Sequence, residues 1–306
     1  MMAEPMDREP AFLQGLKGQL LVNEPMSRHT TWRTGGAAQY FYTPANRQDL
    51  LALLAQLPRD FPIHWVGLGS NLLVRDGGLS GMVIRTAKGL KEISLHYDGV
   101  LYAESGVSCA KIARRAAQHN LRGVEFLAGV PGSFGGALAM NAGAFSGETW
   151  EWVREVEWVD RFGNTSIHPS TEIHHAYREV ELPAQTWILG GWLALEEAGS
   201  GYRGRDRIRT FLNRRAASQP VQSANAGSVF RNPAGDHAAR LIDQAGLKGT
   251  ESGDAVISEV HSNFIINRGA ATSADIENLI RLARDEVRRC SGVELETEVR
   301  IIGEAP

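Results

Sequence analysis

The most constraining feature of this chain is the stretch 129–143, GVPGSFGGALAMNAG. It holds five glycines in fifteen residues and no charged side chain. Glycine loses more conformational entropy on ordering than any other residue, so this cluster indicates a backbone that must approach another group closely. Another glycine-rich stretch, 67–73 (GLGSNLL), lies upstream and is the first of the two along the chain. Because backbone N–H groups of such loops often hold phosphates, the two stretches favour one large phosphate-bearing ligand held at two points.

Neither stretch fits a standard phosphate-binding motif. The pattern Gly67-x-Gly69-x-x-Leu72 lacks the third glycine of the dinucleotide fingerprint, which allows close helix packing. Residues 74–78 are typical of extended chain and a turn rather than a helix, and no GxxxxGK[ST] pattern occurs. Tight turns explain either stretch alone equally well, so the ligand interpretation depends on the pair.

Composition excludes several classes of function. The chain has 306 residues, 43% hydrophobic and 22% charged, as in soluble globular proteins. A formal net charge of −3 gives no electrostatic basis for binding nucleic acid, and no apolar run reaches the roughly 18 residues that span a bilayer. Residues 1–14 are polar and do not resemble a signal peptide.

Cysteine and histidine usage gives two further expectations. Cys109 and Cys290 form no CxxC pair, so we expect a reduced protein of the cytoplasm. The nine histidines show no HExxH spacing, and the adjacent pair at 174–175 would point to opposite faces of a strand. We therefore expect no metal site.

Hydrophobic periodicity divides the chain into three segments, 1–85, 86–204 and 205–306, and predicts a mixed α and β fold. Asn46 and Ser108 are expected to cap helices, Pro58 to end the first helix, and Gly292 to follow the last. The predicted helices lie at 46–57, 108–119, 205–217, 238–245 and 273–290. The predicted strands lie at 63–66, 82–85, 100–104, 151–160, 187–195, 256–257, 264–266 and 299–302. We expect 151–160 and 187–195 to be half-exposed, and 299–302 to complete the third segment.

Eight short motifs follow one another along nearly the whole chain. They are 31–36 (TWRTGG), 67–73 (GLGSNLL), 130–143 (VPGSFGG and MNAG), 177–178 (YR), 225–233 (NAGSVFRNP), 245–249 (AGLKG), 261–267 (HSNFIIN) and 295–300 (LETEVR). Each is weakly specific alone, but all of them in one order are highly specific. The set resembles the UDP-N-acetylenolpyruvoylglucosamine reductase family, flavoenzymes of the second step of peptidoglycan precursor synthesis.

The resemblance implies an α+β chain with a vanillyl-alcohol-oxidase-type (PCMH-like) FAD-binding fold. Residues 1–85 and 86–204 would be its two subdomains, and 205–306 a C-terminal α+β substrate-binding domain whose last strand returns toward the flavin. FAD would be bound non-covalently between the subdomains, with its pyrophosphate at the glycine-rich stretches. The matching cofactor-binding positions are Arg33, Gly67, Gly69, Ser70, Asn71, Leu72, Pro131, Gly132, Ser133, Gly135, Gly136, Asn141, Ala142 and Gly143.

The family reaction implies specific catalytic needs. NADPH transfers hydride to FAD, and the reduced flavin transfers hydride to C3 of the enolpyruvyl group of UDP-N-acetylglucosamine enolpyruvate. The neighbouring carboxylate takes up the charge, and a proton must then reach C2. This reaction needs a general acid near C2 and cationic or hydrogen-bonding groups at the carboxylate.

Three residues match the family's catalytic positions. Ser228 matches the proton donor, Arg178 the arginine that pairs with the developing carboxylate charge, and Glu298 the carboxylate that orients this centre. Without the resemblance, each has a simpler interpretation: a turn hydroxyl bonded to backbone, a solvated surface arginine, and an exposed glutamate of an alternating strand. Because two adjacent anions repel, we expect the pKa of Glu298 to be raised when substrate is bound.

Other positions concern binding of the UDP-sugar. Asn232 and Lys248 match family positions near the substrate, and Arg215 or its neighbour Arg214 could meet the diphosphate, although a helix-surface salt bridge explains either equally well. Glu179 departs from the family, which commonly has Ser there. Residues 253–256 (GDAV) also depart from a more usual Gly-Gly-Ala-Gln-like run.

The short separation of Arg178 from Ser228 resembles the shorter subclass of the family. That subclass lacks an inserted loop with a tyrosine over the substrate diphosphate, so we assign no such tyrosine. The expected partners are the UDP-sugar and NADPH, with no nucleic acid and no membrane, and we expect a monomer. Two alternatives remain open: a flavin oxidase of the same fold, and a non-catalytic nucleotide-binding protein.

Overall fold

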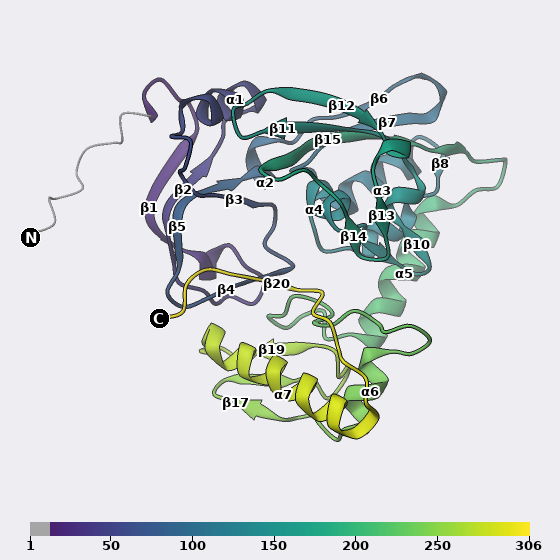
Figure 1. Cartoon of the computed structure of the whole chain (residues 1–306). Helices are drawn as coiled ribbons and strands as arrows, with labels where there is room; N and C mark the ends of the chain where they lie inside the picture. The colour runs from purple at the N-terminus through teal and green to yellow at the C-terminus, as the bar shows by residue number, and fades with distance from the viewer. Residues whose placement is uncertain (1–12) are drawn as a thin grey trace, which may run out of the picture.

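The structure is a computed structural model that describes residues 13–306 (Figure 1). The expectation for 1–14 therefore lies almost entirely outside the described residues. The N-terminal part is a four-stranded sheet in the order β1-β2-β5-β3, with β1 antiparallel to β2 and the other pairs parallel. Its strands are β1 (Gln19–Pro25), β2 (Ala37–Thr43), β3 (Ile63–Val66) and β5 (Leu79–Arg85).

Helix α1 (Arg47–Gln56) begins as the sequence predicts. The Asn46 side chain accepts a hydrogen bond of 3.0 Å from the backbone N–H of Asp49, which satisfies one of the free donors of the first turn. Asp49 in turn accepts from the Tyr42 hydroxyl at 2.6 Å, so the cap also joins the helix to β2. Leu50, Leu53 and Leu54 then face the sheet and are buried.

The middle part is a five-stranded antiparallel sheet in the order β12-β11-β15-β7-β6. Its strands are β6 (Ile93–Leu95), β7 (Val100–Glu104), β11 (Val153–Asp160), β12 (Thr165–Pro169) and β15 (Thr186–Ala194). Around it lie α2 (Thr86–Gly89), α3 (Cys109–Gln118) and α4 (Phe134–Ala139). Ser108 precedes α3 as expected, but among the described residues its side chain makes no capping hydrogen bond.

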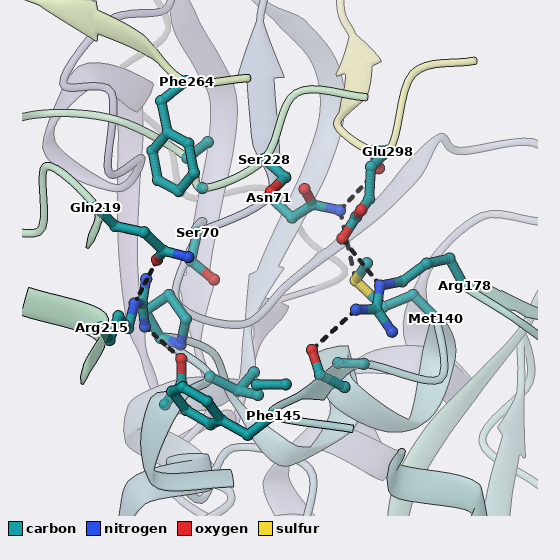
Figure 2. Close-up of a pocket in the computed structure, with 18 of the residues that line it drawn as sticks. Ser70, Asn71, Met140, Phe145, Arg178, Arg215, Gln219, Ser228, Phe264 and Glu298 are labelled. Atoms are coloured by element: carbon teal, nitrogen blue, oxygen red, sulfur yellow. Dashed lines mark hydrogen bonds and ion pairs between the residues drawn. The ribbon is translucent and has the colours of Figure 1, made fainter. Parts of the chain in front are cut away.

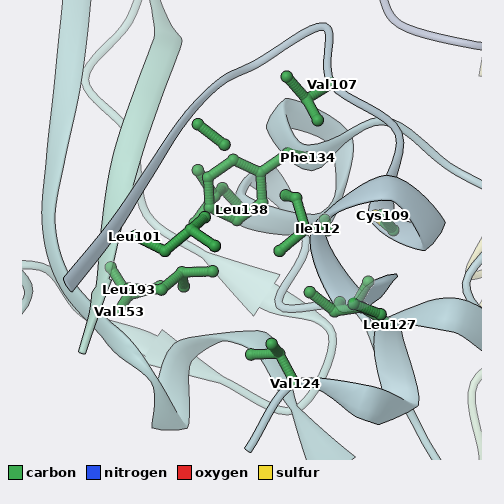
Figure 3. Close-up of a cluster of buried hydrophobic side chains, with 14 of the residues drawn as sticks. Leu101, Val107, Cys109, Ile112, Val124, Leu127, Phe134, Leu138, Val153 and Leu193 are labelled. Atoms are coloured by element: carbon green, nitrogen blue, oxygen red, sulfur yellow. The ribbon is translucent and has the colours of Figure 1, made fainter. Parts of the chain in front are cut away.

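The expectation that 151–160 and 187–195 are half-exposed is wrong. One face of β11 and β15, with Val156 and Ile188, packs on the core under α3 and α4. Figure 3 shows that core, in which Phe134 and Ile112 lie beside Leu101. The opposite face is covered by the N-terminal sheet, because Val159 and Leu189 belong to the cluster that includes α1. The central residues of both strands are therefore buried on both faces, whereas Arg154 and Ala194 toward the ends are exposed.

In the C-terminal part, α6 and α7 pack with a three-stranded sheet in the order β17-β18-β19, whereas α5 packs on the core of the middle part through Ile208. The elements are α5 (Gly204–Ser218), α6 (Ala238–Gln244), β17 (Glu251–Ser252), β18 (Ala255–Ile257), β19 (Ile265–Asn267) and α7 (Ser273–Ser291). A capping box between Thr272 and Asp275 starts α7, and Gly292 ends it with a left-handed φ of 73°.

The expectation that 299–302 completes the C-terminal part is wrong. Strand β20 (Arg300–Ile302) pairs in parallel with β4 (Leu72–Val74), which begins within the first glycine-rich stretch. Figure 1 shows this yellow segment crossing from α7 to the N-terminal part of the molecule. The crossing brings the chain just before β20 next to the glycine-rich stretches.

Three short strand pairs complete the described structure. They are β8 (Leu121–Arg122) with β16 (Glu196–Glu197), β9 (Gly143–Ala144) with β10 (Gly147–Glu148), and β13 (His175–Ala176) with β14 (Glu179–Val180). Within residues 13–306, none of the helices combines the length and apolar character that crossing a bilayer requires.

Candidate active site

The two glycine-rich stretches lie against each other. A Cβ atom at Gly67 would lie 2.1 Å from Ser133 Oγ, and one at Gly132 would lie 3.4 Å from Ser70 Oγ. Gly69 has a φ of +66°, and a Cβ there would lie 1.9 Å from a backbone carbonyl oxygen. Glycine is therefore required at Gly67 and Gly69 for the close approach of neighbouring backbone and side chains.

Free polar groups beside both stretches fit a phosphate-bearing cofactor such as FAD. The backbone N–H groups of Ser70 and Gly132 donate to no backbone carbonyl of the described residues. Thr31 Oγ1 and Ser105 Oγ are buried without a hydrogen-bond partner among those residues. Thr31 lies next to the first stretch, since its N–H donates to the Gly69 carbonyl at 3.1 Å. Buried polar atoms without partners are rare in folded proteins, and a bound group would satisfy them.

A cavity of about 400 Å³ opens beside these stretches (Figure 2). All three predicted catalytic residues, Arg178, Ser228 and Glu298, line it. The other predicted residues that line it are Ser70, Asn71, Pro131, Ala142, Gly143, Arg215 and Asn232. The predicted residues outside its lining are Arg33, Gly67, Gly69, Leu72, Gly132, Ser133, Gly135, Gly136, Asn141 and Lys248.

Arg178 holds a central place in the cavity wall. It occupies the tight turn between β13 and β14 with a φ of 58°, an uncommon conformation for a non-glycine residue. Its Nε donates to Glu298 Oε1 at 3.2 Å, and its Nη1 and Nη2 donate to the carbonyls of Asn141 and Gly143 at 3.1 and 2.8 Å. The side chain is only 14% exposed, so the interpretation as a solvated surface arginine is wrong.

Glu298 differs from the other acidic residues of its segment. The side chains of Glu294 and Glu296 are 63% and 75% exposed, whereas that of Glu298 is 16% exposed. Burial raises the pKa of Glu298, and the nearby Arg178 guanidinium opposes this rise. Burial alone therefore favours the protonated form of Glu298.

The Ser228 hydroxyl faces the cavity and has no hydrogen-bond partner among the described residues. The interpretation as a turn hydroxyl bonded to backbone is therefore wrong. The turn itself is held without it: Gly227 has a φ of +78°, and its N–H donates to Asn225 Oδ1 at 2.9 Å. This arrangement leaves the serine hydroxyl available to a ligand.

Two arginines near the end of α5 also line the cavity. Among the described residues, neither Arg214 nor Arg215 forms an ion pair, so the alternative of a helix-surface salt bridge finds no support. Arg215 donates to Gln219 Oε1 at 2.9 Å and to the Gly129 carbonyl. Burial lowers the pKa of Arg215, and no nearby carboxylate offsets this effect. Such a pair of cations is suited to a diphosphate.

The remaining substrate-related positions are occupied by protein contacts. Asn232 lines the cavity, and its Oδ1 accepts from the N–H of Ala238 at the start of α6. Lys248 lies at the surface, with Nζ 2.8 Å from Asp243 Oδ2. Asp254, one of the departures from the family, accepts from a backbone N–H within its own part of the chain.

Among the lining residues that were not predicted from the sequence are Met140, Phe145, Tyr177, Gln219 and Phe264. Met140, Tyr177 and Phe264 lie inside the motifs, so their position was a usable signal. Nothing in the sequence marks Gln219. Phe145 stacks on Phe211 of α5 with ring centroids 4.5 Å apart, a contact that only the folded chain creates.

The paired sheets, the facing glycine-rich stretches and the cavity beside them define an FAD-binding oxidoreductase. Residues 38–166 match the family model described as "FAD binding domain". Residues 219–302 match the model described as "UDP-N-acetylenolpyruvoylglucosamine reductase, C-terminal domain". The fold is thus assigned from two independent parts of the chain.

Similar proteins identify the family. The chain is 51% identical over 288 residues to the UDP-N-acetylenolpyruvoylglucosamine reductase of Alkalilimnicola ehrlichii, covering 94% of this chain and 96% of that one. The corresponding protein of Methylococcus capsulatus is 50% identical over 94% and 95% of the two chains. The crystal structure of the reductase from Thermus caldophilus superposes with a TM-score of 0.79 at 31% identity, covering 94% and 99%. The chain belongs to the UDP-N-acetylenolpyruvoylglucosamine reductase family.

Proposed function

We propose that this protein is the NADPH-dependent flavoenzyme that reduces the enolpyruvyl group of UDP-N-acetylenolpyruvoylglucosamine to give UDP-N-acetylmuramate, a step of peptidoglycan precursor synthesis. The observation that carries the proposal is the meeting of Ser228, Arg178 and Glu298 in one cavity beside the glycine-rich stretches. FAD held beside the glycine-rich stretches would supply the two-electron redox chemistry between NADPH and the substrate.

Arg178 binds the substrate carboxylate in this proposal. Its guanidinium carries five N–H donors, of which one bonds to Glu298 and two bond to backbone carbonyls. The remaining donors are free to hold carboxylate oxygens as negative charge develops there. Because the backbone carbonyls fix the plane of the guanidinium, little reorganisation is needed during the reaction.

Glu298 orients this centre in the proposal. Burial raises the pKa of Glu298 against the opposing effect of Arg178 and Arg231, and when it is protonated its carboxyl can donate a hydrogen bond to the substrate carboxylate. Ser228 donates the proton to C2. A serine hydroxyl is protonated at any ordinary pH, and its free position in the cavity supports this role.

The UDP part of the substrate would lie toward α5. Arg214 and Arg215 provide two cations that form no ion pair among the described residues, and the amide nitrogen of Asn232 remains available for the substrate. Lys248 would have to exchange its ion pair with Asp243 to contact the substrate. We keep the assignment to the shorter subclass, in which no tyrosine from an inserted loop covers the diphosphate.

We further propose that the protein acts in the cytoplasm as a monomer. Cys109 and Cys290 are free, which agrees with a reducing compartment. Size-exclusion chromatography with light scattering tests the monomer directly. A stable dimer at micromolar concentration would contradict it.

The visible spectrum of the purified protein tests the reaction. Under anaerobic conditions, NADPH should bleach the yellow flavin, and the enolpyruvyl UDP-sugar should restore the colour. Acid precipitation should release the flavin, because it is not covalently bound. Return of colour only on admitting O₂ would favour an oxidase, and a colourless protein unable to take up FAD would favour a non-catalytic nucleotide-binding protein.

A further inference from the structure

The residues that flank the Arg178–Glu298 pair form a second group of charges. Arg231 Nη1 lies 3.8 Å from Glu179 Oε2 and 3.7 Å from Glu296 Oε2. Glu179 directly follows Arg178, and Glu296 precedes Glu298 by two residues. One arginine outside the cavity lining therefore contacts the chain next to both members of the pair.

Backbone hydrogen bonds place Arg231 at this point. Its N–H donates to the Glu296 carbonyl at 2.9 Å, and the N–H of Glu298 donates to the Val229 carbonyl at 2.8 Å. Phe230 and Thr297 form a bridge between these two bonds. The segment that carries Ser228 is thus in fixed register with the segment that carries Glu298.

The hairpin that carries Arg178 lacks such a backbone connection to these segments. Strands β13 and β14 pair with each other over two residues each. Side chains therefore link this hairpin to the Glu298 segment, through Arg178 itself and through the contact of Glu179 with Arg231. Glu179 is also the residue that departs from the family's usual serine.

The hydrogen-bonding capacity of the Arg231 side chain is not satisfied. Its Nε is buried without a partner among the described residues, and both carboxylate contacts are longer than a hydrogen bond. Its interaction with Glu179 and Glu296 is therefore mainly one of charge. Without it, neither Glu179 nor Glu296 would have a cationic partner among the described residues, and both carboxylates belong to the segments that carry the Arg178–Glu298 pair.

We propose that Arg231 is a positioning residue for reduction of the enolpyruvyl substrate. Arg231 balances the charge of Glu179 and Glu296 and holds the Arg178 hairpin against the Glu298 segment. Glu179 and Arg231 then form a pair of opposite charges beside the Arg178–Glu298 pair. The inference rests on the proposed function, because it concerns the half-reaction in which the enolpyruvyl substrate is reduced.

The charged groups around Glu298 predict how loss of the Arg231 charge should change the pH profile of flavin reoxidation. Burial raises the pKa of Glu298, whereas Arg178 and Arg231 both lower it. Removing the charge of Arg231 should therefore move the apparent pKa of the reoxidation step upward, with Glu179 and Glu296 left uncompensated. A purely structural role for Arg231 would not shift this profile.

The test is stopped-flow spectroscopy of the FAD-loaded protein in its two half-reactions. We expect Arg231→Gln to leave flavin reduction by NADPH within about twofold and to slow reoxidation by the enolpyruvyl substrate between about 10- and 100-fold. Arg231→Lys should recover most of the rate, because the charge returns. Arg284→Gln is the matched control, since its contact with Glu294 at 3.4 Å is exposed on the surface.

A second substitution separates charge balance from folding. Adding Glu179→Ser to Arg231→Gln should restore reoxidation by at least about threefold, because one uncompensated carboxylate is removed. Equal losses in both half-reactions, no recovery in the double variant, or an unchanged reoxidation rate in Arg231→Gln would each overturn the inference. Failure of the unsubstituted protein to be reoxidised by the substrate would instead overturn the proposed function.

Discussion

The Asn71 side-chain amide donates a hydrogen bond of 3.0 Å to the backbone carbonyl of Glu298, across 227 residues of sequence. This bond joins the first glycine-rich stretch to the segment before β20, and the N–H of Arg300 returns a bond to the Asn71 carbonyl. Glu298 therefore reaches Arg178 because β20 pairs with β4, and not because of any local feature of its own strand. The site is therefore assembled where segments far apart in the sequence, around Asn71, Arg178 and Glu298, meet.

Ser228→Ala should separate the two half-reactions. Flavin reduction by NADPH should be nearly unchanged, while reoxidation by substrate should slow by about 10²–10⁴, the range for loss of a general acid. Anaerobic stopped-flow absorbance measures both rates. Ser218→Ala is the matched control, since that hydroxyl lines the same cavity but bonds to the Arg214 carbonyl. Equal loss in both half-reactions would remove the proton-donor role from Ser228.

Gly69→Val should give folded protein with little or no flavin. The new side chain would meet the His29 carbonyl and would have to adopt a φ of +66°, so the first glycine-rich stretch must move. The ratio of flavin to protein absorbance measures the effect, with circular dichroism as the check on folding. Gly199→Ala is the control, because nothing lies within 4 Å of its Cβ position. Full flavin content in Gly69→Val would show that the cofactor does not depend on this stretch.

Glu298 should make stability depend on pH in a defined direction. Its pKa in the folded protein is raised above its ordinary value of 4.5, so between these two values the folded state keeps a proton that the unfolded state has lost. Stability should therefore fall as pH rises through this window. Urea unfolding from about pH 4 to 8 should show this loss relative to Glu298→Gln, which has no titrating group there. Parallel curves for the two proteins would contradict the raised pKa.

Arg47→Ala should destabilise the contact between the N-terminal and middle parts. Arg47 of α1 donates both terminal nitrogens to Glu157 of β11, and Glu157 is buried. Losing the arginine leaves an uncompensated buried carboxylate, which costs about 3 kcal/mol in free energy of unfolding. Urea denaturation measures the change. Arg154→Ala, which removes an exposed contact with Glu155 at 3.8 Å, should cost less than about 1 kcal/mol.

The sequence determined much of the local structure. Asn46 and Asp49 start α1, and Thr272 and Gly292 bound α7, because capping and left-handed turns depend on a few neighbouring residues. The glycine-rich stretches could be recognised for the same reason. Their motifs also led to the family, and through it to the three residues that line the cavity.

Only the tertiary structure decided which of these residues meet. Periodicity could not show that β11 and β15 are covered on both faces, because the residues that cover one face belong to the N-terminal part of the chain. It placed 299–302 in the wrong sheet, since a three-residue strand such as β20 carries no information about its partner. The burial of Glu298 and Arg178 follows from that pairing. Residue types and spacing determine local conformation, whereas charge environment and burial are set by contacts between segments far apart in sequence.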